Sequence, residues 1–316
     1  MTDLDITLAR SAIEQLAGVH LGKAGDGTAV KPYVTPDHVD PSLLVAVPRV
    51  LNRTQYGIDE LKLPFVGYDT WNCYEFSTLM PNGLPRTGLL RIVYPADSLN
   101  IVESKSLKLY LNSYNMVKQE HNDAYVMADV CYKIQNDLSH AIDNDDIEVV
   151  YHESGDTYSK PIIGDFVSLE NMFIAEDVEF NAFNESPDLL KTTSNGYTVQ
   201  QWRSSLLRSN CRVTNQPDWG DVYIHIKANK SVMPISLLQY IVSMRKENHF
   251  HEEICECIYK RLYDILKPDE LLVACLYTRR GGIDINPVRA SSSEVLFKYA
   301  INLTNPDTVN IKTLRQ

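Results

Sequence analysis

Residues 209–228, SNCRVTNQPDWGDVYIHIKA, contain two runs with strand character on either side of a polar turn marked by Pro217. Two stretches with helical spacing of apolar residues follow at 234–248 and 251–266, and LLVACLYTRRGGIDINPV at 271–288 returns to strand character. The second half of the chain therefore predicts the order strand, strand, helix, helix, strand.

The same order occurs in the first half, where two strand-like runs joined at Pro81-Asn82-Gly83 precede two helical stretches and a further strand. Residue identities between the halves are faint, so the repeat is one of pattern. Antiparallel strands interrupted by paired helices favour an α+β fold over a doubly wound parallel sheet. We expect two tandem modules, each an antiparallel sheet with paired helices on one face. The first-half elements are predicted at 63–80, 87–96, 105–117, 122–142 and 145–153.

Five segments are expected along the chain. An N-terminal amphipathic helix leads into a Gly-, Pro- and Asp-rich arm at 22–53, which we expect to lie extended over the surface. The glycines of this arm are in the wrong order for a dinucleotide-binding fingerprint. The predicted segments are 1–62 for the helix and arm, 63–155 for the first module, 156–200 for a connecting segment, 201–290 for the second module with the candidate catalytic cysteine, and 291–316 for a C-terminal tail.

The charge of the chain disfavours nucleic-acid binding. Its 316 residues include 30 basic and 41 acidic ones, a net charge of −11 that would repel a phosphate backbone. The N-terminus lacks the pattern of a signal peptide, and apolar stretches such as 235–244 fall short of the roughly 20 residues of a spanning helix. We expect a cytoplasmic protein without nucleic-acid or membrane partners, whose six cysteines are reduced thiols.

Cys211 is a candidate nucleophile. It lies among polar residues, and Asp218 follows seven residues later across the Pro217 turn, so the carboxylate can fold back toward the sulfur. An ordinary cysteine is only a few per cent thiolate at neutral pH, and a nucleophilic role needs a neighbouring base or a positive field, here Asp218 or Arg212. A buried strand cysteine and a turn-capping aspartate are the alternative explanations.

His251 and Glu252 open a predicted helix whose apolar stripe begins at Ile254, so His251 lies off that stripe near the N-terminal end. That position favours a site, although capping of the helix by acidic residues would explain the pair equally well. With Cys255 and Cys257, His251 forms a pattern that resembles zinc ligands. We expect no metal, because the two cysteines point about 200° apart on a helix and no Cys-x-x-Cys pair is present.

Two further clusters suit an anionic ligand. Ser104 and Lys105 open a predicted helix, where free backbone N–H groups and an ammonium make a ready anion site. Arg279 and Arg280 precede Gly281 and offer guanidinium groups beside flexible backbone. A solvated helix start and an exposed arginine pair are the alternatives.

Together these clusters resemble the motifs of the 7-cyano-7-deazaguanine reductase family. Residues 103–110, ESKSLKLY, match its signature, and 209–220, 250–252 and 277–287 match its other motifs in order. The resemblance covers about 41–289. The duplicated pattern is similar to the long, two-module form of the family, and it implies the tunnelling fold shared with GTP cyclohydrolase I and a reaction without a metal.

The resemblance implies an NADPH-dependent, four-electron reduction of the nitrile of 7-cyano-7-deazaguanine to 7-aminomethyl-7-deazaguanine, in tRNA queuosine biosynthesis. Cys211 would attack the nitrile to form a covalent thioimide, Asp218 would donate a proton, and His251 would assist protonation of the reduced nitrogen. A nitrile takes up four electrons and each nicotinamide gives one hydride, so two cofactors bind in turn.

The resemblance also assigns the binding residues. Carboxylates suit the guanine-like edge of the substrate, which presents N–H donors. The substrate would be bound by Val102, Glu103, Ser104, His251 and Glu252, and NADPH by Ser104, Lys105, Arg280 and Gly281. The expected partners are this small molecule and a second copy of the chain, in a homodimer.

Three alternatives stay open. An amidinotransferase of the same superfamily would use the thioimide but not the nicotinamide-binding residues. A zinc hydrolase resembling GTP cyclohydrolase would need His251 and the nearby cysteines as ligands. A non-catalytic module that binds deazaguanines would keep Glu103 and Glu252 without needing a nucleophilic cysteine.

Overall fold

The computed structural model describes a single chain over most of its length. The described residues are 36–121, 125–153, 157–172, 178–194, 196–212, 214–313 and 316. The N-terminal helix predicted at the start of the chain lies outside them.

The centre of the molecule is an eight-stranded sheet within the described residues, in the order β5-β3-β2-β13-β12-β10-β9-β7. All neighbours are antiparallel except β7 and β9. The predicted α+β class is confirmed. The strands are β2 (Val66–Leu79), β3 (Pro85–Pro95), β5 (Glu148–His152), β7 (Val167–Ser168), β9 (Thr198–Asn210), β10 (Pro217–Ala228), β12 (Glu270–Tyr277) and β13 (Ile283–Ala290).

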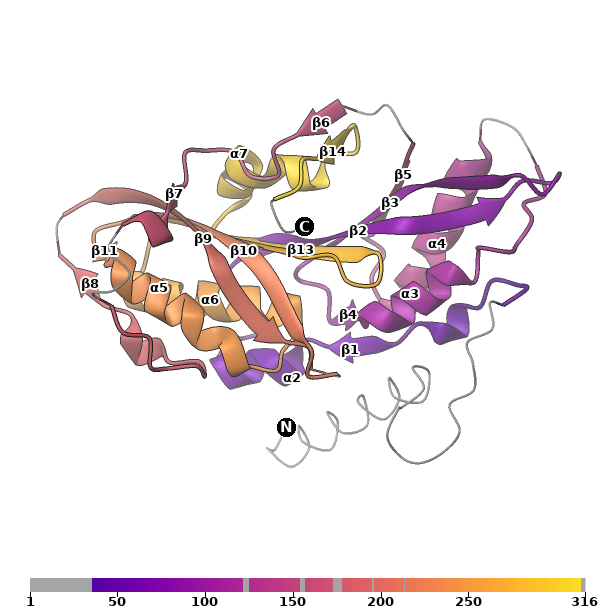
Figure 1. Ribbon diagram of the computed structural model, residues 1–316. Helices are drawn as coiled ribbons and strands as arrows, with labels where there is room; N and C mark the ends of the chain where they lie inside the picture. The colour runs from indigo at the N-terminus through magenta and orange to yellow at the C-terminus, as the bar shows by residue number, and fades with distance from the viewer. Residues whose placement is uncertain are drawn as a thin grey trace, which may run out of the picture.

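Two pairs of helices cover one face of this sheet (Figure 1). The first pair, α3 (Ser104–Asn112) and α4 (Val126–Ile142), lies by β2, β3 and β5, and the second, α5 (Pro234–Ser243) and α6 (His251–Leu266), lies by β9, β10 and β12. Each helix turns an apolar stripe to the sheet, as its sequence spacing predicts. The arrangement is that of two modules, each with paired helices on one face.

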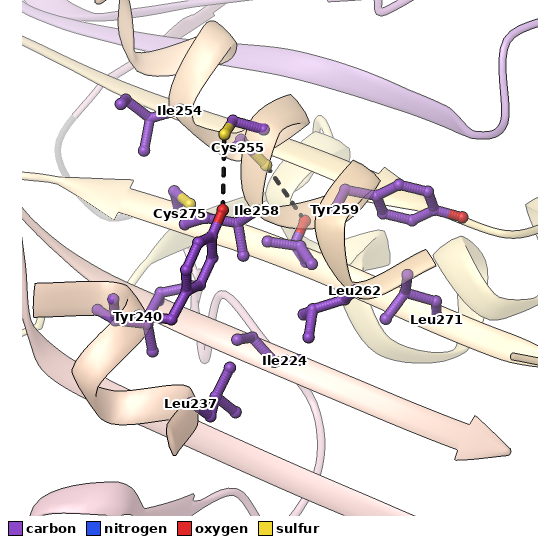
Figure 2. Packing of buried hydrophobic residues seen from close by; sticks show 14 of the residues in the cluster. Ile224, Leu237, Tyr240, Ile254, Cys255, Ile258, Tyr259, Leu262, Leu271 and Cys275 are labelled. Atoms are coloured by element: carbon purple, nitrogen blue, oxygen red, sulfur yellow. Dashed lines mark hydrogen bonds between the residues drawn. The ribbon is translucent and has the colours of Figure 1, made fainter. Parts of the chain in front are cut away.

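Each helix pair buries its own apolar cluster. In the second half, Ile224 of β10 and Leu271 of β12 meet Leu237 of α5 and Ile258 and Leu262 of α6, as Figure 2 shows. All five are fully buried or nearly so, and each such side chain contributes about 1.5–3 kcal/mol by leaving water. The first half has a separate cluster that includes Trp71, Leu107 and Ile134.

The two halves join where β13 pairs with β2. The register runs from Ile283 opposite Cys73 to Ala290 opposite Val66. The backbones come so close at Gly67 that an added Cβ would lie 2.0 Å from the carbonyl oxygen of Val288, so glycine is required there. The module boundary is therefore a continuous part of the sheet.

The arm differs from the extended surface segment that we expected. Past Pro41–Leu43, a short 3₁₀ helix, β1 (Ala46–Pro48) pairs with β4 (Asn100–Val102), and α2 (Val50–Arg53) leads into a 3₁₀ turn at Thr54–Tyr56. These elements bury Arg49 and Arg53 against acidic side chains of the modules. Long-range ion pairing, which local composition does not reveal, holds the arm in the fold.

The ion pairs of the arm belong to a buried cluster of five charges. Arg49 and Arg289 both contact Asp69 of β2, at 2.6 and 2.8 Å. Arg53 and Arg289 both contact Glu256 of α6, at 2.8 and 2.9 Å. This charge cluster ties the arm, both modules and α6 together.

The C-terminal tail covers the opposite face of the sheet. Its helix α7 (Ser293–Thr304) packs on β13, β12 and β2, and β14 (Thr308–Asn310) pairs in parallel with β6 (Thr157–Ser159) (Figure 1). Lys312 then reaches Asp284 of β13, with Nζ 3.0 Å from the carboxylate. The remaining short elements are β8 (Thr192–Thr193), β11 (Ser231–Val232) and 3₁₀ turns at Leu169–Asn171, Pro187–Leu189 and Met244–Lys246. No helix in the described ranges is long and apolar enough to cross a membrane.

Candidate active site

A cavity of about 380 Å³ opens between the two modules, and both contribute to its walls. We call it the site cavity. The first module supplies β2 and the start of α3, and the second supplies the β9–β10 hairpin, the start of α6 and the turn before β13. Its lining consists of Trp71, Val102, Ser104, Lys105, Lys108, Leu109, Cys211, Gln216, Asp218, His249, Phe250, His251, Glu252, Arg280, Gly281, Ile283 and Ile285.

The β9–β10 hairpin presents Cys211 at this cavity. The Cys211 N–H donates to the carbonyl oxygen of Gln216 at 2.8 Å, which closes the turn. On the outer side, Asn210 donates to the Glu247 carbonyl and accepts from the His249 N–H, so the hairpin tip is fixed to the segment before α6. Of the six cysteines Cys211 alone is partly exposed. Its sulfur is therefore the thiol that a ligand in the cavity can reach.

Asp218 lies at the start of β10 and is 3% exposed. Its carboxylate is 3.4 Å from Nε2 of His251 and forms an ion pair with Arg280. Burial acts to raise the pKa of Asp218, but the hydrogen bonds and positive charges of His251 and Arg280 outweigh it and hold the pKa below its usual value. Asp218 is thus ionised at neutral pH and can accept a proton.

His251 is held in place by stacking. Its ring lies on that of Tyr277, with centroids 3.9 Å apart and planes at 13°. Nε2 faces Asp218, whereas Nδ1 is buried with no hydrogen-bond partner among the described residues. A buried ring nitrogen without a partner is costly.

Glu252 is a buried carboxyl group with an unused oxygen. The residue is 2% exposed, and within the described structure its Oε1 atom has no hydrogen-bond partner. Burial, together with the negative charge of Asp69, raises the pKa of Glu252 to about 8. The group lines the cavity and is suited to accept hydrogen bonds from N–H donors of a ligand.

The predicted binding residues Val102 and Ser104 line the cavity at the start of α3, but Glu103 does not. The Glu103 carboxylate turns to its own helix and accepts the N–H of Ser106 at 2.7 Å, as a helix N-cap. The structure therefore brings together the predicted site residues except for the Glu103 side chain.

Two cationic residues of interest, Lys105 and Arg280, line the cavity. Nζ of Lys105 is buried with no hydrogen-bond partner in the described ranges, and Arg280 reaches Asp218 and Gln216 from the turn before β13. Such an ammonium fits a phosphate-bearing ligand, although the adjacent start of α3 is already capped by the Glu103 carboxylate.

Several lining residues were not singled out from sequence. Lys108 lies one helical turn after Lys105, and Ile283 and Ile285 alternate along β13, so helical and strand periods could have indicated them. His249 lies in the dense polar stretch 248–253, but no role was predicted for it. Trp71 gave no comparable signal, because its exposure to the cavity depends on pairing between distant segments. Leu109, Gln216 and Phe250 also line the cavity; they lie in the matched motifs, but no role was predicted for them.

The cysteines of the zinc alternative lie in the core. The thiol of Cys255 donates to the carbonyl oxygen of Val273 at 3.4 Å, and Cys257 lies 3.6 Å from the hydroxyl of Tyr240. Figure 2 shows Cys255 and Tyr240 packed among apolar side chains. Across the described ranges, no three His, Cys, Asp or Glu side chains form a group that could hold a metal ion.

The fold and cavity define a class: a two-module α+β protein with a reachable thiol, an ionised carboxylate and unpaired polar groups at the module junction. Residues 35–150 match the family model described as nitrile reductase, 7-cyano-7-deazaguanine-reductase N-term, and 217–295 match that of QueF-like protein. A relative from Hydrogenovibrio crunogenus, NADPH-dependent 7-cyano-7-deazaguanine reductase, is 35% identical over 267 residues, which are 81% of this chain and 88% of the relative. The chain belongs to the NADPH-dependent 7-cyano-7-deazaguanine reductase family.

Among solved structures, the archaeosine synthase QueF-Like in the apo form is similar to this chain at 16% identity. The match covers 31% of this chain and 95% of the other, with a TM-score of 0.27. So low a score adds nothing to the assignment, which depends on the sequence relatives.

Proposed function

We propose that this chain reduces the nitrile of 7-cyano-7-deazaguanine to an aminomethyl group with NADPH, through a covalent thioimide on Cys211. The observation that carries the proposal is the position of Cys211. It is the partly exposed cysteine of the chain, and it lines the same cavity as the ionised Asp218 and as Glu252, whose Oε1 atom has no hydrogen-bond partner among the described residues.

The first step is addition of the thiol to the nitrile. Asp218 takes the proton of Cys211, the sulfur bonds to the nitrile carbon, and the nitrile nitrogen receives the proton, which gives the thioimide. When bound, NADPH supplies one hydride to each of two reductions. After the first reduction the carbon–sulfur bond breaks, and the sulfur leaves as the imine forms. His251, paired with Asp218, delivers protons to the nitrogen.

The cavity holds the base by groups whose hydrogen-bonding capacity is unused. Glu252 accepts from the N–H donors of the guanine-like edge, and the backbone of Val102 and Ser104 contacts the ring. The Glu103 carboxylate is already bonded to the N–H of Ser106, so it does not contact the base directly. It caps α3 instead and thereby fixes the backbone of Val102 and Ser104. An enclosed cavity also retains the imine between the two reductions.

The residues present also fit NADPH. Ser104 and Lys105 at the start of α3 and Arg280 and Gly281 before β13 all line the site cavity. The buried Nζ of Lys105, which has no partner within the described part of the chain, is the observation that supports an anionic group there. These four residues would bind the cofactor.

Intact-mass measurement tests the covalent step. The purified protein incubated with the cyano base and without NADPH should gain one substrate mass, and the Cys211→Ala variant should gain none. With NADPH, two equivalents should be oxidised per nitrile. Adduct formation in Cys211→Ala, or its absence in the native chain, would refute the mechanism.

The setting of the reaction is also part of the proposal. The net charge of −11 supports a free base rather than an RNA as substrate. We expect a cytoplasmic homodimer, and light scattering of the purified protein tests its oligomeric state.

A further inference from the structure

Lys108 is a second lysine of α3 at the cavity, and the sequence motifs did not assign it a role. It follows Lys105 by three residues, so both project from one side of the helix. Lys108 crosses to the other module and packs against Gly281, where an added Cβ would lie 3.0 Å from its Nζ atom. Gly281 has a φ of +57°, a conformation that favours glycine. The glycine at position 281 therefore leaves room for the Lys108 side chain to pack against this turn.

The partner of Lys108 is Glu75, an acid outside the site cavity. Nζ lies 3.2 Å from the Glu75 carboxylate, and the two side chains are 34% and 59% exposed. Glu75 lies where the β2–β3 register shifts between Cys73 and Phe76, which turns it toward Gly282. A Cβ on Gly282 would lie 2.3 Å from the Glu75 carboxyl carbon.

The Lys108–Glu75 pair borders a small hollow beside the site cavity. Glu75, Gly282 and Lys108 line this hollow, and Lys108 and Gly281 line both spaces. A ligand that extends from the cavity past Gly281 therefore meets Lys108 and then Glu75.

We propose that Lys108 binds the 2′-phosphate of NADPH by exchanging Glu75 for it, and that the two side chains together set the preference for NADPH over NADH. This inference rests on the proposed function. An exposed Lys–Glu pair is weak, so its loss costs little, whereas a dianionic phosphate binds the ammonium more strongly. A carboxylate without its lysine would repel that phosphate and suit a ribose hydroxyl instead.

Steady-state kinetics with both cofactors test the exchange. In Lys108→Met, kcat/KM for NADPH should fall about tenfold or more, as expected for loss of a charge-assisted hydrogen bond, and that for NADH should stay within about twofold. Glu75→Gln should raise kcat/KM for NADPH, because the competing charge is gone. Lys133→Met, an equal charge change on the exposed face of α4, is the matched control and should change neither value.

Two nucleotide probes separate the phosphate groups. By isothermal titration calorimetry, adenosine 2′-phosphate should bind Lys108→Met more weakly than the native enzyme, and adenosine 5′-phosphate should bind both equally. An equal loss of NADPH and NADH use in Lys108→Met would place the lysine at the shared diphosphate and overturn the inference, as would lower NADPH use in Glu75→Gln. Covalent adduct formation without NADPH monitors the proposed function separately, and it should persist in all three variants.

Discussion

Two buried carboxyl groups of the same cavity have opposite properties because their neighbours differ. Asp218 faces His251 and Arg280, and their hydrogen bonds and positive charges hold the pKa of Asp218 below its usual value. Glu252 is desolvated and lies near the negative charge of Asp69, which raises its pKa to about 8. From this separation of pKa values we infer that Asp218 transfers protons and that Glu252 recognises the substrate.

Substrate affinity should therefore depend on pH through Glu252. Below about pH 8 the empty site holds Glu252 protonated, and the acid must lose its proton to accept two N–H donors. Affinity should rise with pH from 6 to about 8 and then level off. Titration of the cyano base into Cys211→Ala, which cannot form the adduct, measures this directly. In the double variant Cys211→Ala/Glu252→Gln, binding of the base should be weaker and should no longer depend on pH. If the affinity still depended on pH, another group would be responsible for the dependence.

Asp218→Asn should slow formation of the adduct by a factor of about 10² or more, because an amide cannot take the thiol proton. Noncovalent binding of the base should change little, since Glu252 supplies the recognition. Mass spectrometry of quenched reactions gives the rate of adduct formation. Titration of the base into the Cys211→Ala variant, with and without Asp218→Asn, gives the noncovalent affinity. A variant that forms the adduct at the native rate would exclude Asp218 as the base.

At the scale of elements, α6 connects the site to the buried charge cluster. Its first turn carries His251 and Glu252 into the cavity, and one turn later Glu256 binds Arg53 and Arg289. Burial acts to raise the pKa of Glu256, but these arginines lower it to about 2. The helix start is thus fixed by charges contributed from the arm and β13.

Glu256→Gln should destabilise the protein by about 3–5 kcal/mol, because it leaves three buried arginines with one buried acid, Asp69, and the partly exposed Glu60. Glu153→Gln is the control, since its ion pair with Arg86 is exposed and should contribute about 0–1 kcal/mol. Urea unfolding followed by circular dichroism compares the two. Similar small losses would mean that the buried cluster is not required for stability.

The elements and the site were not equally predictable. Local periodicity gave the paired helices and the Cys211 hairpin, and family motifs gave most of the cavity. The burial of the arm and the cap by Glu103 could not be predicted, because both depend on contacts that local patterns do not encode. The helix of the C-terminal tail could have been predicted, because Val295, Tyr299 and Leu303 recur at helical spacing and are buried.

At the scale of the molecule, the site exists because β2 and β13 join the modules into one sheet. Their pairing links residues about 200 positions apart, such as Cys73 and Ile283, and no local pattern specifies it. The cavity lies over this junction, with walls from both halves. A ligand in it contacts both modules at once.

Binding should therefore stabilise the whole chain. The cyano base should raise the melting temperature of the native protein by several degrees, as expected for about 2.7 kcal/mol at a hundredfold excess over Kd. The rise should be smaller in Cys211→Ala, which binds without the covalent bond. Differential scanning fluorimetry measures both, and equal shifts would argue against the adduct.

Strand β13 also limits how this protein can evolve. Ile283 and Ile285 line the cavity, and the alternate residues Asp284 and Asn286 serve the tail through Lys312 and Gln316. Inserting or deleting a single residue would exchange these two rows, placing a carboxylate against the substrate and an isoleucine among polar groups. Homologous chains should thus tolerate substitutions along this strand far more readily than any change in its length.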